Sequence, residues 1–229
     1  MMITVLDPIR DPGGSFRRET EDYLRRHYPG DEFRIVTLDD GPEEIGNFTQ
    51  RTLACASALG HLDALSGASA IVINCFADPC LFELRENLDV PVFGAGETTL
   101  HAAAVLGEFS VVGPGENLLS WTRVQVREYG LLDKLVSVRP VRPSLREVLD
   151  GGAGLYEETL RACEEAVSDG ADVVVLGCTG FVGIADKLRE ELWRRYGVPL
   201  LEPLLTTYGV ARSVYPFLVH GKRGLFSGK

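Results

Sequence analysis

The chain has 229 residues, 45% of them hydrophobic and 24% charged, which suits one large globular domain or two lobes of roughly a hundred residues each. With 23 Lys and Arg against 33 Asp and Glu, its net charge of −10 argues against binding to a phosphate backbone. No window is apolar and long enough to cross a bilayer, and the amino terminus shows no signal pattern. We therefore expect a cytoplasmic protein without a nucleic-acid or membrane partner.

Short apolar runs alternate with stretches of helical period along the whole chain, the pattern of an α/β protein with parallel sheets. The apolar runs predict strands at residues 3–6, 33–38, 70–74, 90–93, 109–112, 135–138, 172–176 and 198–201. The stretches between them predict helices at residues 15–28, 49–66, 79–87, 98–106, 117–129, 156–168 and 184–196.

An internal repeat relates the two halves of the chain. Residues 4–8 (TVLDP) correspond to 110–114 (SVVGP), and residues 71–75 (IVINC) correspond to 174–178 (VVLGC). Each half then passes through a helix containing Leu-Arg-Glu and enters a Val-Pro strand. The repeat predicts two similar α/β lobes, each of which contributes one equivalent cysteine.

Those cysteines, Cys75 and Cys178, each end a predicted strand and precede a helix. Ligands of parallel sheets bind beyond the carboxyl ends of the strands, and a helix amino terminus there lowers a thiol pKa. Either cysteine alone is equally well read as a small buried hydrophobe. The repeat favours a functional pair, because lobes related by an approximate two-fold axis would turn both thiols toward one cleft.

Two thiols on opposite sides of one carbon suit stereoinversion, since one thiolate removes the α proton and the other thiol delivers a new one. The enolate oxygen formed on the way needs fixed hydrogen-bond donors. The candidate donors are the Thr179 hydroxyl and the backbone amides of Phe76, Ala77, Thr179 and Gly180.

The remaining cysteines are expected to be free thiols without a catalytic role. Cys55 and Cys163 fall in helical apolar stripes, which indicates core packing, while Cys80 is a weaker candidate for a disulfide or resolving partner of Cys75. No metal site is expected, because the sequence lacks Cys-x-x-Cys and His-x-x-x-His spacing. Its histidines are scattered at His27, His61, His101 and His220.

Three segments resemble a known family. Residues 74–79 (NCFADP) resemble the Cys-Phe-x-Asp-Pro motif of hydantoin racemases, a branch of the cofactor-independent aspartate/glutamate racemase superfamily. Residues 176–180 (LGCTG) resemble the second cysteine motif of that superfamily, and residues 91–97 (PVFGAGE) resemble a further stretch of the hydantoin racemase branch.

The resemblance, which extends to about residue 204, implies two Rossmann-like lobes with the active site in the cleft between them. It also implies that no metal or pyridoxal cofactor is used, and that the chain forms a homo-oligomer. The first lobe would comprise residues 1–95 and a returning segment, 206–229, and the second lobe residues 96–205.

Carried over by position, the two motif cysteines would be the acid/base thiols. Glu97 would orient a substrate NH, unless it is only a carboxylate at a helix start. Asp7 would be the polar residue that ends the first strand, usually Asn in hydantoin racemases, unless it is a cap or turn residue. The loop after it departs from the family, and there Arg10 would bind a substrate carboxylate, pair with Asp11 or point into water.

The expected function is a racemase or epimerase that inverts an acidic α carbon of a small molecule, with a 5-substituted hydantoin or a related ureide as the leading substrate. The alternatives are an amino-acid racemase of the Asp/Glu type, a maleate isomerase that uses covalent attack, and an arylmalonate decarboxylase. Retention of both cysteines argues against the decarboxylase. A non-catalytic small-molecule sensor is the alternative from another class.

Overall fold

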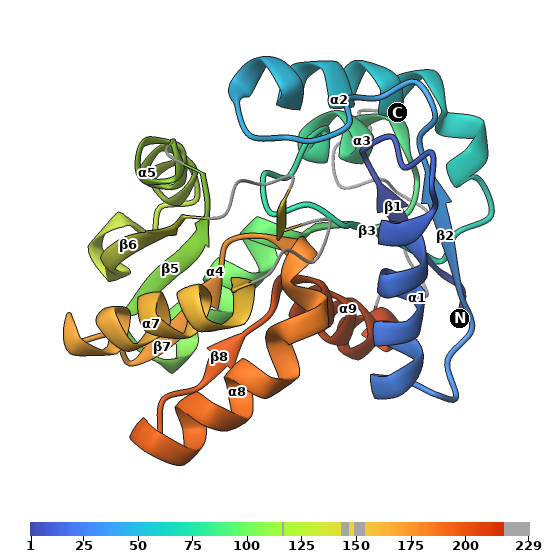
Figure 1. Ribbon diagram of the computed structural model, residues 1–229. Coiled ribbons are helices and arrows are strands. Elements are labelled where there is room, and N and C mark those ends of the chain that lie inside the picture. Colours follow the sequence, from blue (N-terminus) through green and yellow to red (C-terminus); the bar gives the residue numbers. More distant parts are fainter. Residues whose placement is uncertain (116, 143–146, 149–153, 218–229) are drawn as a thin grey trace. The chain divides into compact units, whose positions relative to one another are not determined.

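The computed structural model describes residues 1–115, 117–142, 147–148 and 154–217. The chain divides into two compact units, one formed by Met1–Ala95 with the chain from Leu204 onward, the other by Gly96–Pro203. Each contains one four-stranded parallel sheet (Figure 1). No described helix is long and apolar enough to cross a membrane. His220 and the end of the predicted returning segment lie outside the described residues.

The sheet of the first unit has the strand order β2-β1-β3-β4, and all of its pairs are parallel. Its strands are β1 (Ile3–Asp7), β2 (Phe33–Thr37), β3 (Ala70–Ile73) and β4 (Val92–Gly94). Every residue of β1 and β3 is buried. Their largely apolar sequences follow from this position, because central parallel strands are covered on both faces.

Helices cover both faces of this sheet. They are α1 (Ser15–His27), α2 (Phe48–Gly60), α3 (Leu81–Asn87) and α9 (Pro203–Val214). The crossover from β1 to β2 runs opposite to those from β2 to β3 and from β3 to β4. Right-handed crossovers therefore place α1 on one face and α2 with α3 on the other. Figure 1 shows α2 and α3 together, and Ala58, Leu81 and Leu84 from these helices join one apolar cluster with Leu6 and Ile73 of the sheet.

The second unit repeats this topology with the strand order β6-β5-β7-β8, again with every pair parallel. Its strands are β5 (Phe109–Pro114), β6 (Leu135–Val141), β7 (Val173–Leu176) and β8 (Leu200–Leu201). Its longer helices are α4 (Ala95–Leu106), α5 (Leu118–Glu128), α7 (Leu155–Ser168) and α8 (Val182–Tyr196). The matching strand orders confirm the internal repeat predicted from the sequence.

Two helical segments differ from the prediction. The helix expected at 49–66 ends at Gly60, and a separate short 3-10 helix, η1 (Leu62–Leu65), follows it. Helix α9 was not predicted, because its Thr-Thr pair and Gly209 have low helix propensity. Tertiary packing stabilises α9 instead: the Tyr208 ring lies 4.9 Å from the ring of Tyr28, and its hydroxyl donates to Asp31 (3.3 Å).

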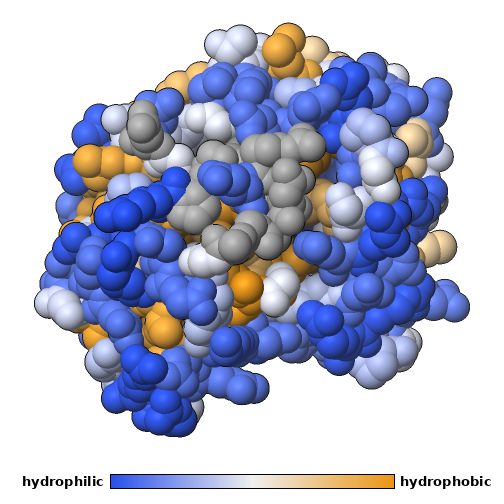
Figure 2. Space-filling view, viewed as in Figure 1, coloured by the Kyte–Doolittle hydropathy of each residue, from blue (hydrophilic) through white to orange (hydrophobic). Residues whose placement is uncertain are grey.

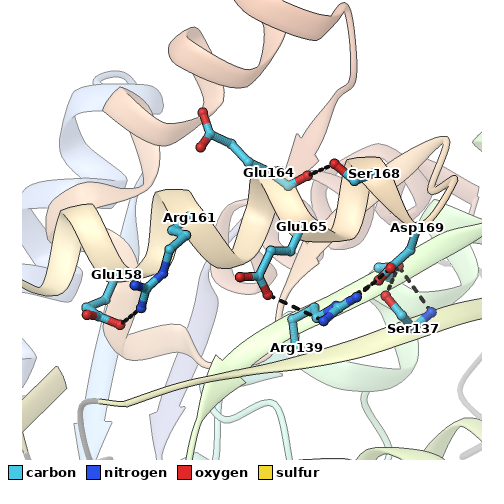
Figure 3. Close-up of polar contacts among 9 residues, drawn as sticks. Ser137, Arg139, Glu158, Arg161, Glu164, Glu165, Ser168 and Asp169 are labelled. Atoms are coloured by element: carbon cyan, nitrogen blue, oxygen red, sulfur yellow. Dashed lines mark hydrogen bonds and ion pairs between the residues drawn. The ribbon is translucent and has the colours of Figure 1, made fainter.

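Charged side chains lie at the surface, as the composition suggests, and hydrophilic residues dominate the described part of the face in Figure 2. In the second unit Arg139 of β6 contacts α7 and Asp169, the residue that caps the carboxyl end of α7 (Figure 3). Its Nε donates to Asp169 Oδ2 (2.7 Å), and its Nη1 lies 3.4 Å from Glu165 Oε2. The bond from Arg139 holds the pKa of Asp169 below its ordinary value.

We expect Arg139→Gln to lower the free energy of unfolding at pH 7 by less than about 1 kcal/mol, because exposed ion pairs are screened by water. The depressed pKa of Asp169 means that this contribution is present above the unfolded pKa, near 4, and is lost as the pH falls through the folded value. Urea unfolding at pH 7 and pH 3 measures both effects. Arg161→Gln, which breaks a pair with Glu158 inside α7, is the control. A larger loss of stability in Arg139→Gln at pH 3 than at pH 7 would contradict the assigned pairing of Arg139 with Asp169.

Candidate active site

Polar side chains meet where the central strands of the first sheet end. Asp7 is the last residue of β1, and Asn74 follows β3. Asn74 Nδ2 donates to Asp7 Oδ1 (2.8 Å) and to Thr20 Oγ1 (3.1 Å). The Thr37 hydroxyl donates to Asp7 Oδ2 (3.1 Å). The Asp7 carboxyl is therefore held by side chains from β2 and from the residue that precedes Cys75.

Asp7 is completely buried, and this burial raises its pKa from 3.8 to about 7. The bonds from Asn74 and Thr37 lower the pKa, but by less than burial raises it. Asp7 is not the cap of the following helix, because Gly14 occupies that position. The structure thus places an internal carboxyl, with a proton affinity suited to neutral pH, at the end of the strand beside β3.

Cys75 begins a tight turn after β3 and is partly buried. Its carbonyl accepts a hydrogen bond from the amide of Asp78 (3.1 Å), and the buried side chains of Phe76 and Ala77 lie within the turn. Asp78 and Cys80 have positive φ angles of 48° and 66°. Left-handed conformations are costly for residues other than glycine, so surrounding contacts must hold this turn in place.

One such contact is the packing of the buried Asp78 side chain against Gly94, the last residue of β4. A Cβ atom built on Gly94 would lie 2.6 Å from the Asp78 carboxyl carbon. Glycine at this position therefore leaves room for the carboxyl group that follows Cys75 in the motif.

Gly94→Ala is expected to destabilise the protein by about 1–3 kcal/mol, the usual cost of overpacking a close contact. Because Asp78 and Cys75 share one turn, we expect the variant to lose activity even where it remains folded. Thermal unfolding and activity at a temperature well below the transition separate the two effects. Gly30→Ala is the control, since a Cβ atom at that position would meet nothing within 4 Å, and equal behaviour of the two variants would contradict the role of Gly94.

Cys178 follows β7 in the second unit and is 9% exposed. Its Sγ accepts a hydrogen bond from the Gly180 amide (3.3 Å), and Thr179 and Gly180 are both buried. Burial raises the pKa of Cys178 to about 12, while the Gly180 bond lowers it and Glu202 raises it. The expectation that this position lowers the thiol pKa is wrong for Cys178, because one amide donor does not offset the effect of burial.

The two units differ in the polar groups around their thiols. The repeat pairs Asp7 with Gly113 and Asn74 with Gly177, and a Cβ atom on Gly113 would lie 3.3 Å from Gly177 Cα. This close backbone contact leaves no room for an equivalent polar pair. An acidic group that acts on Cys178 in the second unit is Glu202, which is buried, follows β8 and was missed by the sequence reasoning. A carboxylate directly after a predicted strand was the signal for it.

Glu97 and Arg10 are the other predicted site residues. Glu97 lies in the first turn of α4 and is partly buried. Arg10 is exposed and pairs with Glu43 (2.5 Å) rather than with its neighbour Asp11. The Gly180 amide donates to the Cys178 sulfur, so its use as a donor to substrate stays a prediction.

All five cysteines are free thiols. Cys163 lies on the buried face of α7, as predicted, and Cys55 is partly buried beside the core of the first unit. Cys80 is buried and donates to the carbonyl oxygen of Cys55 (3.5 Å). The structure therefore brings Cys80 to Cys55, a contact that the sequence reasoning did not anticipate.

The Asp/Glu/Hydantoin racemase family model matches residues 14–208, most of both units. The chain belongs to this family. Over 147 residues it is 34% identical to the hydantoin racemase of Paenarthrobacter aurescens, a match that covers 63% of this chain and 61% of that protein. The hydantoin racemase of Pseudomonas sp. (strain NS671) is 29% identical over 181 residues, which cover 76% of this chain and 70% of that one.

Among solved structures, allantoin racemase from Klebsiella pneumoniae superimposes on this racemase-family chain with a TM-score of 0.87 at 25% identity. The superposition covers 100% of this chain and 94% of that one. Together with the repeated sheet topology, this agreement confirms the predicted α/β fold with two Rossmann-like lobes.

Proposed function

We propose that the protein is a cofactor-independent racemase that inverts C5 of a 5-substituted hydantoin or a related ureide such as allantoin, with Cys75 and Cys178 as its acid/base groups. The observation that carries this proposal is the equivalent position of the two thiols. Cys75 lies just beyond the central strand β3, and Cys178 lies just beyond the central strand β7. The names of the hydantoin and allantoin racemases to which the chain is similar support the substrate class.

The chemistry requires one group that accepts the C5 proton and another that supplies a proton from the opposite face. Because burial raises the pKa of Cys178 to about 12, we assign Cys178 as the proton donor for the enantiomer whose C5 proton faces Cys75. Cys75 is then the base. In the reverse direction Cys178 acts as a thiolate, and the Gly180 amide stabilises that form.

The surroundings of Arg10 bear on the alternative of a carboxylate substrate. Its guanidinium pairs with Glu43 at the surface, so its charge is already balanced by a protein carboxylate. The first loop therefore offers little support for an amino acid or a dicarboxylate as the substrate. A hydantoin carries no carboxylate and does not require a cation there.

The decisive experiment follows each enantiomer of 5-benzylhydantoin, and of allantoin, in deuterated water. We expect optical activity to be lost together with the C5 proton signal, at rates far above those of a protein-free blank. A 5,5-disubstituted hydantoin, which has no C5 proton, is the negative control. No exchange above the blank with any hydantoin or ureide, or turnover of glutamate instead, would overturn the proposal.

A further inference from the structure

A second group of thiols lies apart from the strand-end motifs, on the α2–α3 side of the first unit. Cys55 projects from α2, Cys80 directly precedes α3, and Glu83 lies in the first turn of α3. Both sulfur atoms and a carboxylate oxygen of Glu83 lie within 4.8 Å of one another. The sequence did not indicate this cluster, because 25 residues separate its two cysteines.

The spacing of these three atoms suits a tetrahedral metal ion. Zinc binds thiolate at about 2.3 Å and carboxylate at about 2.1 Å, so two ligands of one ion lie about 3.4–3.8 Å apart. The cluster approaches this spacing before any metal is bound. Rotations of the side chains that move each ligand atom by about 1 Å would bring the three atoms to the spacing that zinc requires.

The three side chains differ in burial, and therefore in how far each can move to bind an ion. Cys80 is 3% exposed and has a left-handed backbone conformation, and its sulfur already points toward α2, where it donates to the Cys55 carbonyl. Cys55 is partly buried and Glu83 is exposed. The least mobile ligand is therefore in position, and the two that must adjust have room to do so.

We propose that Cys55, Cys80 and Glu83 bind one thiophilic divalent cation, with zinc as the best match. Two thiolates and one carboxylate are a borderline-soft ligand set that zinc accepts, and the exposure of Glu83 leaves the fourth position to a water molecule. On binding, each thiol releases its proton to solvent and forms a sulfur–metal bond, while the carboxylate binds as it stands. No oxidant takes part.

The third ligand distinguishes a metal site from a disulfide. Joining Cys55 to Cys80 would require an oxidant and would give Glu83 no part, whereas a cation uses all three side chains. The described residues contain one other cluster of this size, formed by Asp39, Asp40 and His61. It has no sulfur, and Asp40 already accepts a hydrogen bond from Ser57, so it suits a thiophilic ion less well.

A bound ion would act on structure rather than on the proposed chemistry. Cys80 lies in the segment that continues from Cys75, so the metal would fasten the end of that segment to α2. A ligand that binds only the folded state raises its stability in proportion to its affinity and concentration. We therefore expect zinc to raise the melting temperature of the metal-free protein.

The test uses the whole chain, stripped of metal with a chelator and kept reduced with a phosphine. The protein is titrated with Co²⁺, whose bonds to thiolate absorb in the near ultraviolet. We expect one equivalent to produce this band and Zn²⁺ to remove it. Cys55→Ser and Cys80→Gly should weaken binding at least about 100-fold, and Glu83→Gln about 10-fold, since lost metal contacts typically cost at least that much. Glycine at position 80 keeps the left-handed backbone, which makes it the gentler substitution.

Two control variants locate the ion. His61→Ala and Cys163→Ala should leave the sulfur–cobalt band unchanged. A band that survives Cys55→Ser and Cys80→Gly, or that disappears in Cys75→Ala or Cys178→Ala, would overturn the proposal, as would the absence of any sulfur band. None of these measurements uses a racemase substrate, so failure of the proposed function and failure of this site are distinguishable.

Discussion

Cys75→Ala and Cys178→Ala are each expected to reduce racemisation by about 10³-fold, the usual scale for the loss of a positioned acid or base. Both variants should lose a similar amount, because inversion needs one group on each face of the carbon. The rate of change of optical rotation with a single enantiomer of a 5-substituted hydantoin measures this loss.

The two variants should differ in the enantiomer that still exchanges its proton. In Cys178→Ala the thiol of Cys75 remains, and it can remove and return a proton on its own face without inversion. Only one enantiomer should then take up deuterium with retention of configuration, and Cys75→Ala should show the opposite preference. Proton NMR of C5 in deuterated water, together with chiral chromatography, distinguishes exchange from inversion.

The control for this pair must separate chemistry from packing, because Cys178 is buried. Cys178→Ser keeps a similar volume and an acceptor for the Gly180 amide, but its hydroxyl is a far weaker acid than a thiol. We expect the serine variant to be as inactive as the alanine variant while its melting temperature stays closer to that of the unaltered protein. Full inversion by any of these single variants would rule out a mechanism with two acid/base thiols.

The sequence predicted the strands and the repeat because central parallel strands leave a strong local signal. Residues 70–73 and 173–176 are apolar throughout and lie between helical patterns, and the structure pairs them with β1 and β5. Helix α9 lacked such a signal, since contacts of Tyr208 with residues far away in the sequence stabilise it. Local propensity is a weak guide where tertiary packing decides.

The sequence could suggest candidate residues for the site, but not their protonation behaviour. Motif and repeat together nominate Cys75 and Cys178 as candidates, but a pKa depends on burial and on partners that a linear pattern does not reveal. Cys178 is accordingly a much weaker acid than its place at a strand end suggested. The buried Glu202 is separated from it by the whole of α8, so their electrostatic coupling had no sequence signature.

The repeat explains why the two halves share a fold but not an electrostatic environment. A strand order depends on apolar periodicity, which both halves keep. The residue that ends the first strand of each unit is free of that constraint, and it is Asp7 in one half and Gly113 in the other. We infer that an ionisable group at the end of the first strand belongs to the first unit alone, so its removal tests that unit separately.

Asp7→Asn is expected to stabilise the protein at neutral pH. The folded pKa of Asp7, about 7, lies above its unfolded value of 3.8, so the folded state holds this proton more tightly. Stability is therefore unaffected by Asp7 below about pH 4, falls by about 1.4 kcal/mol per pH unit between the two pKa values and levels off above pH 7. Asparagine removes this penalty, on the order of 4 kcal/mol in total, because it cannot ionise.

The substitution suits the site, because an amide at position 7 can accept from Asn74 through its oxygen and donate to the Thr37 hydroxyl through its nitrogen. Urea unfolding of both proteins at pH 5, 6, 7 and 8 should give curves of stability against pH that diverge up to pH 7 and then run parallel. Thr37→Val is the matched control: it removes a donor that favours the ionised carboxylate, so it should destabilise the protein most at pH 8. In the Asp7→Asn background Thr37→Val should lose that pH dependence. Parallel curves for Asp7→Asn and the unaltered protein over the whole range would mean that burial does not control the charge of this carboxyl.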